Sequence, residues 1–241
     1  MKENNEKTVS IKDGPILWGI YNIFNLLREV SVFQQIRNIS KWLWERKYKK
    51  KHPQASKEEH DKAWIENRPF ILGYLFPEIW VISNILLACI GCILVAKSSC
   101  DIIKWCFLVY AFLRTLEIFV YQINVLLFDP IKTSTTYKIK SATRTVLLLI
   151  CNILEYILWF SVVYIFIYRL NNPDINTTKI IFESITTLAN ISSPNEFFES
   201  EKELELIFVA HIESVIGIFI NIICLARFIS LLPPVESIDK K

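Results

Sequence analysis

The chain has 241 residues, of which 52% are hydrophobic and 21% are charged, with a formal net charge of +3. So small a charge argues against a nucleic-acid-binding protein, and the abundance of Ile, Leu and Phe excludes a predominantly disordered chain. The apolar residues are concentrated after residue 70, whereas a soluble domain spreads them periodically. This composition predicts an all-α membrane protein with a polar N-terminal arm.

The N-terminal arm, residues 1–70, is predicted to be cytoplasmic and to contain one amphipathic helix from Pro15 to Trp44. Apolar residues recur there every three or four positions, at Ile16, Ile20, Ile23, Leu27 and Val30. This spacing places them on one face of a helix. Two tryptophans then precede a basic cluster, Arg46 to Lys51. Aromatic residues beside basic ones suit the headgroups of an anionic leaflet; packing on a neighbouring subunit or on the ends of the spans is the alternative.

Four later segments are long enough to cross a bilayer, which takes about 20 mostly apolar residues. They are Ile71–Ala96, in which Pro77 and Glu78 move the expected start to Ile79, and Trp105–Phe128, Thr145–Tyr168 and Leu206–Leu232. The predicted organisation is two peripheral helices in 71–128, a cytoplasmic linker 129–144, a third and fourth span within 145–232, and a tail 233–241. Lys and Arg cluster in the arm and the linker, so we expect a multi-pass cell-membrane protein with both termini in the cytoplasm.

Several charged residues lie inside the predicted spans, where ionisable groups are costly and usually face protein or water. Arg114 and Glu117 are three positions apart in the second span, and Glu155 lies in the third. We expect Arg114 to pair with one of these carboxylates. The alternative, a voltage sensor, needs several arginines at every third position, and this span has one. His211 and Glu213 lie near the outer end of the fourth span, where they either tune the adjacent connection or meet water.

The connection between the third and fourth spans contains a short semi-apolar segment, Lys179–Ile191. It is too short and too polar to cross a bilayer, yet its apolar residues have near-helical spacing, at Ile180, Ile181, Ile185 and Leu188. The segment predicts a re-entrant helix, shielded from lipid by its neighbours. A helix lying on the outer membrane surface is the alternative.

A spanning helix, a short helix, an extended turn and a second spanning helix in this order resemble the pore module of the potassium-channel superfamily. The resemblance covers roughly Thr145 to Leu232. Thr187-Leu188 match the Thr-Leu that ends the family's pore helix, and Ile191 falls where its filter has Val or Ile. The following span, IESVIGIFINIICLARFISLL, is similar to the inner helix of small bacterial channels, and Gly217 falls near the family's gating-hinge glycine.

The resemblance departs from the family at the selectivity filter. Ser192 and Pro194 replace the glycines, and Ser193 replaces the aromatic residue. Glycine permits the alternating backbone of a carbonyl-lined filter, whereas proline fixes φ and lacks a donor. We therefore do not expect a standard potassium filter. A wider, weakly selective pore, a pore that opens only when assembled or triggered, and a non-conducting relic remain as alternatives.

The resemblance implies a homotetramer in the lipid bilayer, with the fourth span lining a pore for passive passage of monovalent cations. The narrow part would be formed by Thr186, Thr187, Ala189, Asn190, Ile191, Ser192 and Ser193, with Asn221 and Cys224 facing a cavity below it. Acidic residues would surround the outer mouth and concentrate cations there: Glu196, Glu199, Glu201 and Glu203. The alternative is a non-conducting membrane scaffold or signalling protein that retains the pore-module fold.

Enzymatic chemistry has little support in the sequence. The chain has three His, two of them on the N-terminal arm, and lacks the H-E-x-x-H spacing of a zinc site as well as a G-x-S-x-G nucleophile motif. We therefore predict no catalytic, metal or cofactor site.

Overall fold

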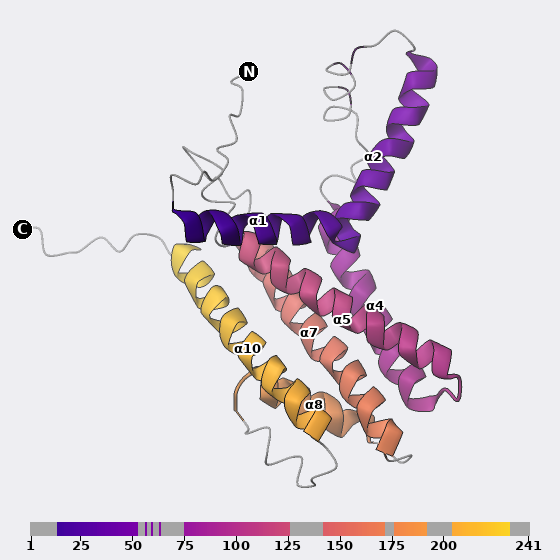
Figure 1. The fold of residues 1–241 in the computed structure, drawn as a ribbon, viewed down its shortest axis with the longest axis vertical. Helices are drawn as coiled ribbons and strands as arrows, with labels where there is room; N and C mark the ends of the chain where they lie inside the picture. Colours follow the sequence, from indigo (N-terminus) through magenta and orange to yellow (C-terminus); the bar gives the residue numbers. More distant parts are fainter. Residues whose placement is uncertain are drawn as a thin grey trace, which may run out of the picture. The chain divides into compact units, whose positions relative to one another are not determined.

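A computed structural model describes residues 14–52, 75–125, 142–171, 176–191 and 204–231, together with the single residues 56, 59 and 63. These parts of the chain contain seven α-helices (Figure 1), which confirms the predicted all-helical class. They are α1 (Pro15–Val30), α2 (Val32–Lys51), α4 (Phe76–Lys97), α5 (Asp101–Ile123), α7 (Ala142–Asn171), α8 (Thr177–Leu188) and α10 (Leu204–Leu231).

Three of these helices are long and apolar enough to cross a membrane: α4 over Phe76–Lys97, α7 over Val146–Arg169 and α10 over Leu204–Ala226. They correspond to the first, third and fourth predicted spans. The second predicted span is helical as well and lies in α5, but α5, which carries four charged residues, is not among the three. Its role as a membrane span stays a prediction.

The chain divides into two compact units, Thr8–Asn84 and Ile85–Lys241, the second together with Met1–Lys7. The first unit shows that the predicted single helix from Pro15 to Trp44 is wrong, because Ser31 separates two helices. Ser31 has ψ of 144°, which ends α1, and its side-chain oxygen accepts a hydrogen bond from the backbone N–H of Gln34. Serine is a favoured residue at this N-terminal capping position.

The predicted start of the first span near Ile79 is also too late, since α4 begins at Phe76. Pro77 therefore lies in the first turn of the helix. A proline is tolerated there because the N–H that it lacks would have no partner within the helix.

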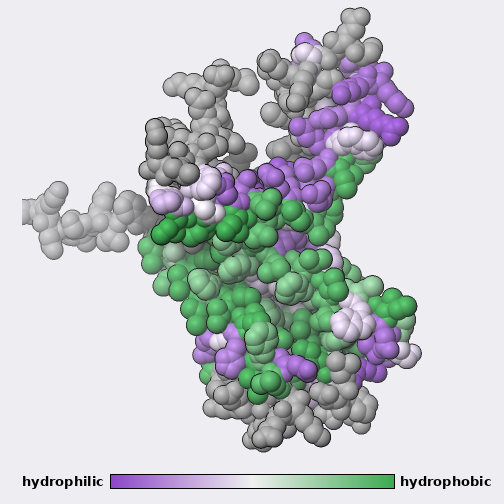
Figure 2. Space-filling view, in the orientation of Figure 1, coloured by the Kyte–Doolittle hydropathy of each residue, from purple (hydrophilic) through white to green (hydrophobic). Residues whose placement is uncertain are grey.

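In the larger unit, α5, α7, α8 and α10 pack around an interior that contains Tyr156, Trp159, Ile165 and Leu206, each at most 1% exposed. Gly91 of α4 lies against this interior: a Cβ there would come within 3.3 Å of Val162. Large apolar side chains also cover the outer surface, and Figure 2 shows them along α5 and α10. Several polar and charged side chains, among them Arg114, Glu155 and Glu213, lie inside instead. This distribution fits helices that face lipid rather than water.

Candidate functional site

The site is built around α8, which lies between α7 and α10 (Figure 1). The Asn176 side chain starts the helix by accepting hydrogen bonds from the backbone N–H groups of Thr178 and Lys179, at 3.1 and 3.3 Å. The buried face of α8 consists of Ile180, Ser184, Thr187 and Leu188. Their spacing of three and four positions directs one side of the helix into the interior.

Glu213 of α10 lies at the centre of this packing and is fully buried. Its carboxylate accepts a hydrogen bond from the Tyr164 hydroxyl of α7 and one from the Ser184 hydroxyl of α8, the latter at 2.5 Å. Ser184 Oγ also lies 3.0 Å from the backbone oxygen of Ile157. In the part of the chain that the structure describes, no basic side chain forms an ion pair with Glu213.

These contacts place α8 deep along the neighbouring helices. Ile157 is in the middle of the apolar stretch Val146–Arg169, and Glu213 is near the middle of Leu204–Ala226. Ser184 therefore reaches the central part of both helices, although it belongs to a helix of only 12 residues.

The end of α8 approaches α10 still more closely at Gly217. A Cβ at position 217 would lie 2.9 Å from the carbonyl carbon of Leu188 and 3.1 Å from the Asn190 amide nitrogen. Real Cβ atoms essentially never come so near to backbone, so only glycine lets these two helices meet here. Because α10 is continuous through this position, the structure gives Gly217 a packing role, and its predicted role as a hinge stays a prediction.

A tight turn closes α8. The backbone N–H of Asn190 bonds to the oxygen of Thr187 at 3.0 Å, and that of Ile191 bonds to the oxygen of Thr186 at 2.9 Å. Asn190 has φ of 57°. This is a Schellman motif with asparagine in the left-handed position that glycine usually occupies. The Asn190 side chain also bonds to α10, through the hydroxyl of Ser214 and its backbone oxygen.

The residues predicted to form the narrow part have different surroundings. Thr187 is 5% exposed and lies inside the bundle, Thr186 is half-buried, and Ala189, Asn190 and Ile191 are exposed, the last at 77%. On α10, Asn221 is exposed and Cys224 is half-buried. Ser192 and Ser193 and the acidic mouth residues Glu196, Glu199, Glu201 and Glu203 lie outside the described residues.

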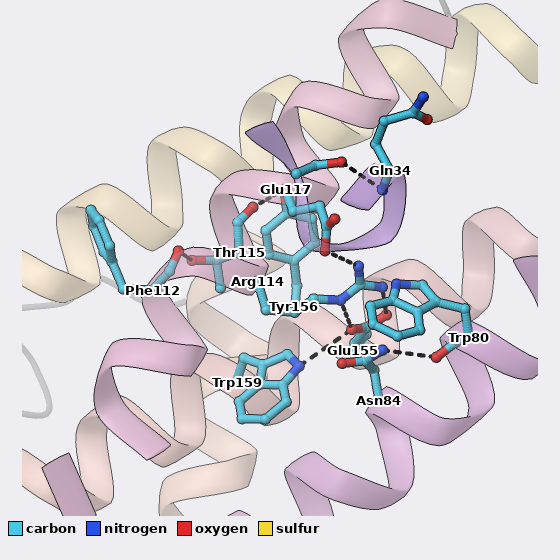
Figure 3. Close-up of polar contacts among 11 residues, drawn as sticks. Gln34, Trp80, Asn84, Phe112, Arg114, Thr115, Glu117, Glu155, Tyr156 and Trp159 are labelled. Atoms are coloured by element: carbon cyan, nitrogen blue, oxygen red, sulfur yellow. Dashed lines mark hydrogen bonds and ion pairs between the residues drawn. The ribbon is translucent and has the colours of Figure 1, made fainter. Parts of the chain in front are cut away.

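A second buried polar cluster joins α5 to α7 (Figure 3). The Arg114 guanidinium pairs with Glu117, with Nη1 and Oε2 2.5 Å apart, and with both oxygens of Glu155. Trp159 donates a further hydrogen bond to Glu155 at 3.3 Å. Arg114 therefore pairs with both Glu117 and Glu155. We interpret this cluster as a structural contact that holds α5 against α7.

The hydrogen bonds of Glu213 to Tyr164 and Ser184 were not anticipated. The sequence placed Glu213 near the outer end of a span, with water as one possible neighbour, whereas its side chain is fully buried. One signal was present: Ser184 lies four positions after Ile180 and four before Leu188, hence on the apolar face of α8, where a hydroxyl needs a partner.

Among the described residues, no three His, Cys, Asp or Glu side chains lie close enough together to hold a metal ion. No protein-family model matches the chain, and neither a curated protein nor a solved structure matches it.

Proposed function

We propose that the chain is one subunit of a homo-oligomeric membrane pore that passes monovalent cations, with α8 as a re-entrant helix between α7 and α10. The observation that carries this proposal is the depth of α8: Ser184 and Leu188 contact the central parts of the two long helices. A helix lying on the outer membrane surface would contact only their ends. A backbone turn at membrane depth is tolerated where protein or a water-filled opening surrounds it.

The faces of α5 support its assignment as a membrane span, the second of the four predicted. Its outward side carries Val109, Phe112 and Leu116, which are 44–62% exposed. Its charges at Arg114 and Glu117 point inward and pair. A helix with apolar residues on its outer side and paired charges on its inner side is better suited to lipid than to water.

Exposed polar residues on α10 support assembly with other copies. His211 and Asn221 are exposed, as is Asn190 beside Ser214, while apolar neighbours such as Phe208 and Ile222 are exposed too. Polar side chains against acyl chains are unfavourable, and they usually face other helices or water. An arrangement of copies around a common axis, four in the tetramer that the pore-module resemblance implies, would give this face of α10 such surroundings.

The test is ion flux through the purified full-length protein in liposomes, with potassium or sodium gradients and several voltages, pH values and calcium concentrations. We expect cation flux. Ile191→Asp should raise it severalfold over Ile191→Asn, because a ring of carboxylates at an exposed position next to the turn concentrates cations. Equal flux in the two variants would place residue 191 away from the pathway. Absence of flux under all conditions would contradict the pore and favour a non-conducting scaffold.

A further inference from the structure

The apolar face of α1 is uncovered along its whole length. The predicted stripe is exposed by 78% at Ile16, 41% at Ile20, 59% at Ile23, 46% at Leu27 and 68% at Val30. At 100° per residue these five side chains lie within about 80° of one another around the helix. Leu26 beside the stripe is 63% exposed as well. A continuous exposed apolar face of this kind marks an interaction site.

The smaller unit itself shows what lies near this stripe. It contains the first turns of α4, one of the three helices apolar enough to cross a membrane. Phe33, directly after the bend that ends α1, packs on Phe76 and Trp80 of α4, with ring centroids 5.0 and 6.1 Å apart. The end of α1 is thereby held at the beginning of α4, the point where that helix would enter the bilayer.

Most described basic residues of the same unit lie outside α1. The largest group is in the last turns of α2, where Arg46, Lys47 and Lys49–Lys51 are all exposed. Phe33 and Lys51 are separated by about 27 Å of helix at 1.5 Å per residue, and Figure 1 shows the basic end of α2 as the part of this helix farthest from the start of α4. Within α1, only Arg28 and Glu29 carry charge. Attraction to anionic headgroups is therefore not what would hold α1.

We propose that α1 is an interfacial helix that lies in the surface of the lipid bilayer, with the stripe of Ile16, Ile20, Ile23, Leu27 and Val30 turned toward the acyl chains. Burial of apolar area holds it there, as in other amphipathic helices of this type. The basic end of α2 stands away from the lipid and is free for other contacts. This inference does not depend on whether the protein conducts ions.

The experiment uses the full chain in liposomes, with an environment-sensitive fluorescent amino acid incorporated at Ile23. The matched control carries it at Asn22, an exposed polar position about 120° around the helix from the centre of the stripe. We expect quenchers attached to lipid chains to quench the probe at position 23 several times more than the probe at position 22. Iodide in the buffer should quench the probe at position 22 more than the probe at position 23.

Vesicles of phosphatidylcholine alone and with phosphatidylglycerol distinguish apolar from electrostatic anchoring. We expect the same lipid quenching in both, unchanged by the triple replacement Lys49→Glu, Lys50→Glu and Lys51→Glu, and strongly reduced by Ile20→Asn with Leu27→Asn. If lipid quenching at position 23 required phosphatidylglycerol, or if it were lost in the triple Lys→Glu variant, apolar anchoring of α1 would be ruled out. Protection of position 23 from both quenchers would show that protein, from the rest of this chain or a second copy, covers the stripe.

Discussion

Two glutamates of the larger unit, Glu155 on α7 and Glu213 on α10, are equally buried but have different partners. Both are 0% exposed. Glu155 pairs with a guanidinium that also binds Glu117, whereas Glu213 is held by the hydroxyls of Tyr164 and Ser184. The first carboxylate joins α5 to α7 through charge, and the second joins α7, α8 and α10 through neutral donors.

The difference indicates which connection tolerates change. Removing one member of a buried ion pair leaves an uncompensated charge, and this penalty exceeds what the pair itself contributes. A carboxylate held by hydroxyls leaves no opposite charge behind when it is replaced by a side chain of the same shape. The α5–α7 connection is therefore a fixed part of the scaffold, whereas the contacts of α8 with α10 depend mainly on shape and on hydrogen-bond geometry.

The largest effect is expected for Arg114→Met. This change leaves Glu155 and Glu117 buried without their cation, and it should lower the free energy of unfolding by about 3–5 kcal/mol. Titration of the purified protein with SDS, followed by tryptophan fluorescence, measures it. The double variant Arg114→Met with Glu155→Leu should recover part of the loss. If the double variant were less stable than Arg114→Met, the loss in the single variant would not come from the unpaired charge of Glu155.

An intermediate effect is expected for Gly217→Ala. The new methyl group overlaps the carbonyl of Leu188, so α8 must move away from α10, at a cost of about 2 kcal/mol, as for overpacking in a core. Gly19→Ala in α1 is the matched control, since a Cβ there meets nothing within 4 Å. The same SDS titration compares the two. Equal stability of both variants would show that the close approach of Leu188 to residue 217 is absent.

The smallest effect is expected for Glu213→Gln, about 1 kcal/mol, since an amide of the same shape keeps an acceptor for the Tyr164 or Ser184 hydroxyl. The same replacement at position 155 should cost more, because the Arg114 charge then loses a partner. Thermal unfolding of the two variants, side by side in one detergent, measures the difference. If Glu213→Gln lost more stability than Glu155→Gln, the contrast between a charge-paired α5–α7 connection and a hydroxyl-bonded α8–α10 connection would be wrong.

Local patterns in the sequence predicted much of the helical architecture. The stripe of α1 followed from spacing alone, and the pairing of Arg114 with Glu117 followed from their separation of three positions on one helix. The long apolar helices α4, α7 and α10 followed from their length and composition. These features depend on residues close to one another in the chain, so periodicity is sufficient to find them.

The contacts that define the candidate site join distant residues and could not be predicted in this way. Ser184 and Glu213 are 29 positions apart, and Tyr164 and Glu213 are 49 apart. Nothing in their spacing indicates that they meet. The bend at Ser31 was missed for another reason: the apolar period continues across it, and only the capping preference of serine indicates that two helices meet there.

The turn that closes α8 has a consequence for any ion that reaches it. The carbonyl oxygens of Thr186 and Thr187 accept hydrogen bonds from the turn's own N–H groups, and that of Leu188 accepts one from the Asn190 side chain. Dehydrating a cation requires several oxygens that point at it together in place of its water molecules, whereas each of these three already accepts a hydrogen bond within or beside the turn. If the proposed pore runs past this turn, we expect the turn itself to contribute little to discrimination between sodium and potassium, which differ most once dehydrated.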